Sequence, residues 1–176
     1  MYQEVNGDLI QLALEGNFDV ITHGCNCFCT MGAGIAPKMA KAFSCDQFKM
    51  EHPQLKGHID KLGNIDGRVL NIFNQKAYIP ENSPRELILK LPDYKLTVVN
   101  SYTQYGFGSN HSNGVSAPID YEALILCMRK INFTFKGQRV GLPQIGCGLA
   151  GGDWNVVKAI IQRELKDCNI TIVIFK

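Results

Sequence analysis

Apolar residues in this chain come in short runs that are separated by polar and glycine-containing segments. Short runs rich in valine, isoleucine and phenylalanine, bounded by turn residues, are typical of β-strands. The run at 170–175 is apolar almost throughout, which indicates a strand buried on both faces. The pattern predicts strands at residues 2–6, 18–23, 68–73, 76–79, 96–100, 139–142 and 170–175.

Between these runs, apolar residues recur at the spacing of an amphipathic helix. Ile35, Met39 and Phe43 define one apolar stripe, which predicts a helix at 34–44. Short helices are predicted at 9–14 and 46–51. A further helix, with Pro118 in its first turn, carries Tyr121, Leu124, Ile125, Met128 and Ile131, and the last one carries Val156, Val157, Ile160, Ile161 and Leu165.

Strands that alternate with helices favour an α/β domain, and residues 1–176 contain no repeat or linker that would divide it. In parallel sheets, ligands bind beyond the carboxyl ends of the strands. Three polar or glycine-rich loops, at 24–34, 101–117 and 144–152, follow predicted strands in this way. We therefore predict that the three loops meet at one cleft.

Composition excludes several classes of protein. The net charge of +2 gives no strongly basic face for nucleic acid. No apolar run is long enough to span a membrane, and the N-terminus does not resemble a signal peptide. Seven cysteines, an odd number, indicate reduced thiols in a cytosol-like compartment, so we expect a cytoplasmic protein.

Two of the loops contain glycines and precede helices, the arrangement that offers backbone N–H groups to an anion. Two such loops suit a diphosphate better than a single phosphate. Neither loop matches the Walker A pattern or the dinucleotide fingerprint. Turn glycines of no functional importance would explain either loop equally well.

His23 and Asp153 are the candidate catalytic residues. His23 is at the exit of a predicted strand and Asp153 follows the second glycine loop, so both could face one cleft. A histidine can transfer a proton at neutral pH, and a carboxylate can activate water. A histidine satisfied by its neighbours and a plain helix N-cap are the alternative interpretations.

His23, Cys25, Cys27 and Cys29 alternate along the chain, which raises the question of a metal site. Zinc sites favour a second ligand pair elsewhere, and none is present, so we predict no metal. Buried packing cysteines fit the pattern better. A Cys–His nucleophile stays open, although no pairing singles out one thiol.

Four motifs in order make the chain resemble a macrodomain, the ADP-ribose-binding family. They are Gly7-Asp8-Leu9, His23-Gly24-Cys25-Asn26, Gly32-Ala33-Gly34-Ile35-Ala36 and Pro143-Gln144-Ile145-Gly146-Cys147-Gly148-Leu149. The resemblance covers nearly the whole chain. It is strongest to the branch that contains the ADP-ribose 1''-phosphate phosphatases and the terminal ADP-ribose glycohydrolase-like proteins.

This resemblance implies a three-layer α/β/α sandwich with a mixed, mostly parallel central sheet and an ADP-ribose cleft at its crest. Asp8 would accept from the adenine amino group, Asn26 would hold the distal ribose, and the two glycine loops would enclose the diphosphate. The implied ligand-binding residues are Asp8, Leu9, Gly24, Cys25, Asn26, Met31, Gly32, Ala33, Gly34, Ile35, Ala36, Ser101, Tyr102, Ile145, Gly146, Cys147, Gly148, Leu149, Ala150, Gly151 and Gly152.

Catalysis differs between the branches. The phosphatase-like branch uses a histidine before the Cys-Asn pair and an aspartate after the second loop, which match His23 and Asp153. The glycohydrolase-like branch uses a lysine at the strand end that reads Ser101-Tyr102-Thr103-Gln104 here, so its covalent mechanism does not carry over.

The leading hypothesis is therefore a monomeric, cofactor-free hydrolase that converts ADP-ribose 1''-phosphate to ADP-ribose and phosphate. One alternative is an ADP-ribosyl hydrolase that acts on modified protein or nucleic acid. The other is a non-catalytic module that reads ADP-ribose.

Overall fold

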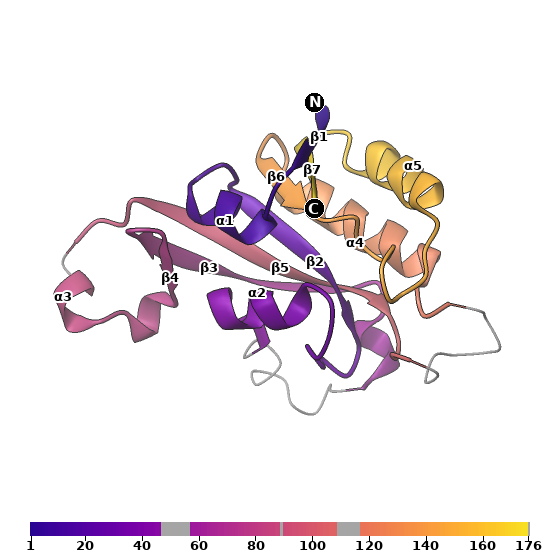
Figure 1. Cartoon of the computed structure of the whole chain (residues 1–176), viewed down its shortest axis with the longest axis horizontal. Coiled ribbons are helices and arrows are strands. Elements are labelled where there is room, and N and C mark those ends of the chain that lie inside the picture. Colours follow the sequence, from indigo (N-terminus) through magenta and orange to yellow (C-terminus); the bar gives the residue numbers. More distant parts are fainter. Residues whose placement is uncertain (47–56, 89, 109–116, 176) are drawn as a thin grey trace.

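A computed structural model of the protein describes residues 1–46, 57–88, 90–108 and 117–175. Strands and helices alternate along the chain (Figure 1), as the sequence pattern predicts. In chain order the elements are β1 (Tyr2–Asn6), α1 (Leu9–Leu14), β2 (Val20–Asn26), α2 (Ala36–Phe43), η3 (Ile59–Lys61), β3 (Ile65–Phe73), β4 (Lys76–Tyr78), η4 (Pro80–Asn82), α3 (Arg85–Ile88), β5 (Tyr94–Gln104), α4 (Tyr121–Thr134), β6 (Arg139–Leu142), α5 (Trp154–Glu164) and β7 (Asn169–Ile174).

In the described part of the chain, seven strands form one sheet in the order β1-β7-β6-β2-β5-β3-β4. The first five of these strands are mutually parallel, and β3 and β4 are antiparallel to their neighbours. This is the mixed, mostly parallel sheet that the resemblance implies. Val173 of β7 is buried, as expected for a strand covered on both faces.

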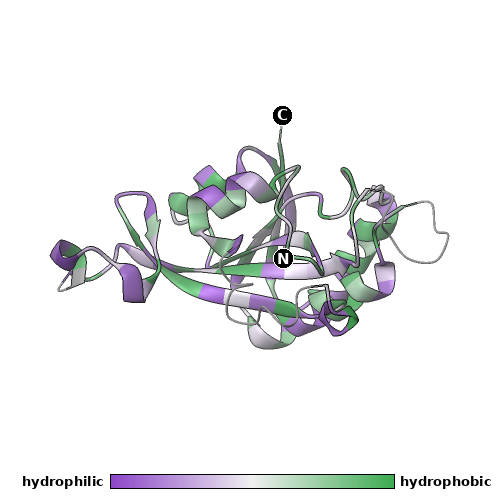
Figure 2. Cartoon of the chain, turned by 90° about the horizontal axis from the view of Figure 1, so that it is seen from below, coloured by the Kyte–Doolittle hydropathy of each residue, from purple (hydrophilic) through white to green (hydrophobic). Residues whose placement is uncertain are grey.

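Two apolar clusters lie on opposite faces of the sheet and make the three layers. On one face, α1 and α2 pack through Ala13, Met39 and Phe43. On the other, α4 and α5 pack through residues such as Leu124 and Ile161. Figure 2 shows hydrophilic and hydrophobic residues interleaved along the helices, as amphipathic elements require.

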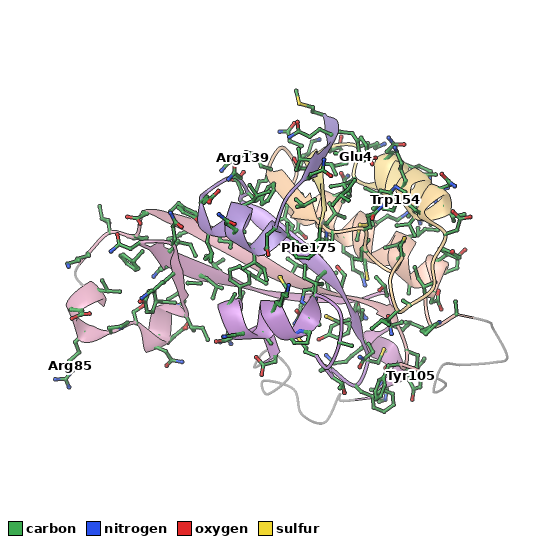
Figure 3. All side chains as sticks on the ribbon, in the orientation of Figure 1. Glu4, Arg85, Tyr105, Arg139, Trp154 and Phe175 are labelled. Atoms are coloured by element: carbon green, nitrogen blue, oxygen red, sulfur yellow. The ribbon has the colours of Figure 1, made fainter. Side chains whose placement is uncertain are left out.

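The β3–β4 hairpin lies toward one end of the long axis, and both termini lie near its middle (Figure 1). Figure 3 places Arg85, near the β3–β4 hairpin, at one end of the long axis and Tyr105 toward the other, with Phe175 near the centre. None of the helices in the described ranges has the length and apolar content that a membrane span requires.

Several predicted boundaries are wrong. β2 continues through Asn26 and β5 through Gln104, so the polar residues predicted to begin two loops belong to strands. The reason is the parallel β2–β5 ladder, which pairs Gly24 with Ser101 and satisfies the backbone regardless of side-chain polarity. Pro118 precedes α4, whose N-cap is Asp120.

The segment between β4 and β5 contains η4 and α3. The short helix predicted at 46–51 lies almost entirely outside the described residues. Asn74 and Gln75 form the turn between β3 and β4, and both have positive φ, as a tight hairpin turn requires.

We predict that Gly141→Ala destabilises the fold, because an added Cβ would approach the Phe18 ring to 2.7 Å. Phe18 is buried and its ring cannot move aside, so overpacking should cost about 1–3 kcal/mol. Urea unfolding measures the loss. Gly32→Ala is the matched control, since its Cβ would meet only a Thr30 methyl at 3.7 Å. Equal midpoints for the two variants would contradict the prediction.

Candidate functional site

A cleft of about 530 Å³ opens at the crest of the sheet, between β2 and β6. These strands pair only at Val20 with Val140 and at Ile21 with Gly141, after which β2 runs on alone on that side. The helix that follows β2 packs on one face of the sheet, and the helix that follows β6 packs on the other. The cleft therefore occupies the topological switch point where α/β sheets bind their ligands.

One wall of the cleft is the segment that enters α2. Ala33, Gly34 and Ile35 line it, and Gly34 has a φ of +62°, which a side-chain-bearing residue rarely adopts. The N-cap of α2 is Ile35, whose side chain makes no capping hydrogen bond. The first N–H groups of this helix therefore have no side-chain acceptor, which suits them to an anion.

The opposite wall is the loop after β6. Gly152 N–H donates to the Gly146 carbonyl at 2.8 Å and Gly151 N–H to the Gly148 carbonyl at 3.0 Å, so the loop is closed by its own backbone. Gly146 has positive φ, and an added Cβ would collide with Ile119 at 2.3 Å. Here the glycine is required by packing as well as by backbone conformation.

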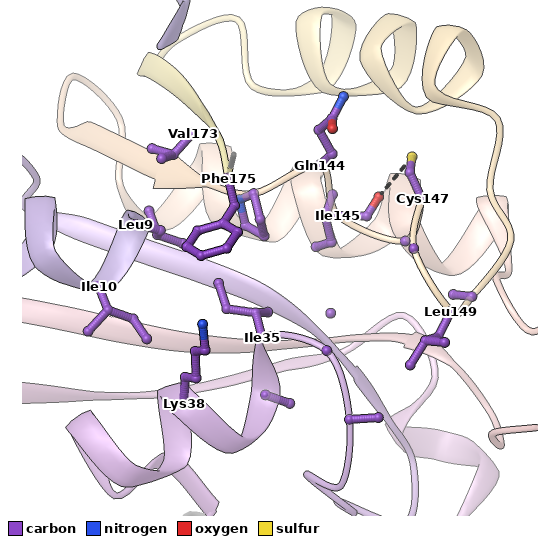
Figure 4. Close-up of a pocket in the computed structure, with 18 of the residues that line it drawn as sticks. Leu9, Ile10, Ile35, Lys38, Gln144, Ile145, Cys147, Leu149, Val173 and Phe175 are labelled. Carbon is purple, nitrogen blue, oxygen red and sulfur yellow. Dashed lines mark hydrogen bonds between the residues drawn. The ribbon is translucent and has the colours of Figure 1, made fainter. Parts of the chain in front are cut away.

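The two ends of the cleft differ in chemistry. At one end Asp8 caps α1, and its Oδ1 accepts from Ile10 N–H at 2.8 Å, which fixes the carboxylate. Phe175 is 67% exposed there, and the Lys38 ammonium lies 4.5 Å from its ring centre. Leu149, 77% exposed, projects at the opposite end (Figure 4).

His23 is not where its proposed catalytic role requires it. Its side chain is fully buried and does not line the cleft. On β2 it points to the α2 face, where its Nε2 lies 2.9 Å from the Asn100 Oδ1. Because a carboxamide oxygen only accepts, Nε2 must carry the proton. The expectation that His23 and Asp153 share one cleft is therefore wrong.

His23 belongs to a buried polar network. The Asn100 Nδ2 donates to an Asp66 oxygen at 3.0 Å, Tyr102 donates its hydroxyl proton to the other oxygen, and the Lys61 ammonium is 3.6 Å from Asp66. Burial raises the pKa of Tyr102, and the nearby Asp66 carboxylate raises it further. These contacts satisfy polar groups that would otherwise be costly inside the protein.

Asp153 is exposed and also lies outside the cleft lining. Its Oδ1 accepts from Asn155 N–H at 2.7 Å, which makes it the N-cap of α5, as predicted. Its backbone N–H donates to the Tyr121 hydroxyl at 2.9 Å. These contacts are sufficient to explain Asp153 as a structural residue.

The structure brings most of the predicted ligand-binding residues together. Those that line the cleft are Asp8, Leu9, Gly24, Ala33, Gly34, Ile35, Ala36, Ile145, Gly146, Cys147, Gly148, Leu149 and Ala150. Those that do not are Cys25, Asn26, Met31, Gly32, Ser101, Tyr102, Gly151 and Gly152.

Three of the residues outside the lining have clear structural partners. Asn26 donates to the Thr30 carbonyl at 3.0 Å and accepts from Thr30 N–H at 3.2 Å, which closes the turn after β2. Ser101 shares a buried hydrogen bond of 2.7 Å with Thr22. Tyr102 is turned toward Asp66.

Sequence reasoning missed several lining residues, namely Gly7, Ile10, Lys38, Gln104, Pro143, Gln144, Val173 and Phe175. Phe175 follows an apolar strand and gave no signal of its own. The sequence pattern places Gln104 in the loop at 101–117, whereas in the structure it is the last residue of β5. A predicted strand that continues as far as the partner of Asn26 would include Gln104 and would place it at the crest of the sheet.

The cysteines behave as packing residues. Cys25, Cys27, Cys29 and Cys45 are buried, and burial raises the pKa of Cys45 to about 12. Cys147 lines the cleft, and its thiol lies 3.5 Å from the Ile145 carbonyl (Figure 4). Within the described ranges, no group of three or more His, Cys, Asp or Glu side chains is arranged to hold a metal ion.

Comparison with known sequences gives one relevant relative. No protein-family model matches the chain. An uncharacterized 17.5 kDa protein encoded in the tk-vs intergenic region of Enterobacteria phage T4 is 29% identical over 177 residues. That similarity covers 96% of this chain and 93% of the phage protein.

Solved structures are more informative about the fold. A Bacteroides thetaiotaomicron protein of unknown function is similar over 99% of this chain and 98% of its own, with a TM-score of 0.67 and 24% identity. The macrodomain of Thermus aquaticus DarG covers 100% of this chain and 98% of its own, with a TM-score of 0.60 and 19% identity.

Thermosipho africanus DarTG, solved in complex with ADP-ribose, is similar over 99% of this chain and 41% of its own, with a TM-score of 0.64 and 17% identity. Taken together, these similarities show that the chain has the macrodomain fold.

We predict that His23 makes the fold sensitive to acid. Burial lowers the pKa of His23 to about 4 from 6.5. Between pH 6.5 and pH 4 the unfolded chain binds a proton at His23 that the folded chain does not bind. The contribution of His23 to the free energy of unfolding is therefore complete above pH 6.5 and is lost as the pH falls toward 4. The loss should reach about 3 kcal/mol at pH 4.

Urea midpoints measured between pH 7 and pH 4 test this prediction. His23→Gln is the control, because it can still donate to Asn100 but does not titrate, while the surface carboxylates are unchanged. The variant should lose less stability on acidification than the wild type. Parallel pH profiles for the two proteins would contradict the assignment.

Proposed function

We propose that this protein binds ADP-ribose in the cleft at the β2–β6 switch point and hydrolyses ADP-ribose 1''-phosphate. The observation that carries the proposal is that two glycine-rich walls face each other across one cleft of about 530 Å³. The cleft has the size of a ligand-binding site. Its walls offer backbone N–H groups, which suit a diphosphate without requiring lysine or arginine.

The ends of the cleft suggest the orientation of the ligand. Asp8 and the exposed ring of Phe175 would hold adenine, one by accepting from its amino group and the other by stacking. The diphosphate would lie between Gly34 and Gly148. The terminal ribose would then lie toward Leu149 and Gln104. Thermosipho africanus DarTG, part of which has the same fold, was solved in complex with ADP-ribose, which supports this class of ligand.

Hydrolysis would depend mainly on binding and orientation. Among the described residues of the cleft lining, Asp8, Lys38 and Cys147 carry the ionisable side chains. Asp8 and Lys38 lie at the adenine end, and the Cys147 thiol, whose pKa is raised by burial, stays protonated. Backbone donors directed at the phosphoryl group would stabilise the charge that develops on it in the transition state.

The composition of the cleft lining favours a second candidate function, a module that binds ADP-ribose without turning it over. No described lining residue at the terminal-ribose end is a histidine or a carboxylate. The hydrolysis of ADP-ribosyl groups from protein or nucleic acid is the other enzymatic alternative. Assays with all three substrate classes separate these possibilities.

We predict that Asp8→Asn weakens ADP-ribose binding about 10- to 100-fold, because asparagine cannot offer the charged acceptor to the adenine amino group. Asparagine remains a good N-cap, so α1 should be unaffected. Isothermal titration calorimetry with ADP-ribose and with ribose 5-phosphate measures the effect. If Asp8 reads adenine, the variant loses affinity only for ADP-ribose. Unchanged ADP-ribose affinity would contradict the orientation.

We predict that the wild type releases inorganic phosphate from ADP-ribose 1''-phosphate and that His23→Gln and Asp153→Asn retain turnover within about threefold, since neither side chain reaches the cleft. Phosphate release in a continuous assay measures both. ADP-ribosylated DNA and protein are parallel substrates. Tight binding of ADP-ribose without turnover of any substrate would identify the protein as a reader. A large loss of turnover in either variant would show that the substituted residue takes part in catalysis and would contradict the prediction.

A further inference from the structure

The carboxyl end of β5 is irregular, and the irregularity involves the cleft. Cys25 of β2 pairs with Tyr102, but the next residue, Asn26, pairs with Gln104. Thr103 is therefore an extra residue, and the strand contains a β-bulge. Bulges next to functional sites change the direction in which a side chain points. Here the residue after the bulge is Gln104, which lines the cleft.

The bulge has an energetic cost. The Thr103 hydroxyl is buried and has no hydrogen-bond partner among the described residues. It lies behind Gly24, where an added Cβ would come within 3.0 Å of it. An unsatisfied buried hydroxyl loses its hydrogen bonds to water and gains none in return. A buried polar group left without a partner suggests that this segment serves a purpose other than stability.

Several contacts hold the bulge in place. The Cys27 N–H is shared between the carbonyls of Gln104 and Tyr105, at 3.2 and 2.9 Å. On the other side, Asp120 N–H donates to the Thr103 carbonyl at 2.9 Å, and Ile119 bridges to Gln104. The backbone that carries Gln104 is thus fixed from both sides.

The Gln104 side chain is also oriented. Its Nε2 donates to the Gly106 carbonyl at 2.7 Å, which fixes the plane of the carboxamide. The other end of the same group, Oε1, has no partner among the described residues. A fixed amide with a free oxygen is suited to accept a hydrogen bond from a water molecule in the cleft.

Other polar side chains of the lining are less suited to this role. Asp8 and Lys38 lie at the adenine end, and the amide of Gln144 is directed toward α5 (Figure 4). The Cys147 thiol is engaged with the Ile145 carbonyl. Gln104 is the other glutamine among the described lining residues.

We propose that Gln104 is a catalytic residue that holds the attacking water through its Oε1. This inference rests on the proposed function. The water oxygen attacks phosphorus as the bond between phosphorus and the 1'' oxygen breaks. A water proton passes to a phosphate oxygen of the substrate dianion and then to the departing 1'' oxygen, giving ADP-ribose and phosphate. Gln104 orients the water and gains no proton.

The test is Gln104→Met, which keeps the length of the side chain and removes its acceptor. Loss of the oriented water should lower kcat about 100-fold, while the calorimetric Kd for ADP-ribose stays within about threefold. A role limited to holding the Gly106 segment would instead change the Kd and the urea midpoint and leave kcat nearly unchanged. Gln162→Met, on the exposed face of α5, is the matched control.

The outcomes are separable. An inactive wild type that binds ADP-ribose overturns the proposed hydrolysis and, with it, this role for Gln104. An active wild type together with a Gln104→Met variant of similar kcat overturns the role of Gln104 alone. A variant that loses ADP-ribose binding shows that the residue is structural. Gln104→Asn, with a retracted carboxamide, should give a kcat between those of the wild type and the methionine variant.

Discussion

The candidate site depends on the early separation of β2 and β6. The two strands share only two residue pairs, after which β6 ends and its loop crosses to the α5 face. On the other side β2 pairs with β5 along its whole length, with one β-bulge between Cys25 and Asn26. One edge of β2 is therefore paired with β5 along its length, whereas the other edge is paired with β6 only at Val20 and Ile21. This asymmetry places Gly24 on the floor of the cleft and allows the two glycine loops to face each other.

Sequence reasoning predicted the order of the elements and both walls of the cleft, because hydrophobic periodicity and glycine-containing turns are local signals. It was wrong about His23, because the alternation of a strand decides which face a residue takes. β2 continues through His23, so the imidazole points to the α2 face while Gly24 borders the cleft. Had the strand ended before His23, the histidine would have been free to turn toward the cleft.

The buried network around His23 explains why polar residues occur in the middle of the sheet. Asn100 joins the imidazole to Asp66, and Lys61 lies beside both Asp66 and the Tyr102 ring. Each partner satisfies a group that would otherwise be unpaired, and such networks specify one arrangement of the interior. The long-range contacts involved cannot be seen in a local sequence pattern. The same limit applies to Gln104, whose position depends on the bulge opposite Asn26.

The cleft presents side chains at its ends and backbone groups in its middle, and this distribution follows from the fold. At the end where β7 and α1 meet, the lining presents the Asp8 carboxylate and the exposed Phe175 ring. In the middle the walls present backbone at Gly34 and Gly148, where an added Cβ would meet no atom within 4 Å. An exposed Phe175 and an exposed Leu149 leave apolar surface at both ends. Burying that surface would add to ligand affinity the hydrophobic contribution that backbone donors cannot supply.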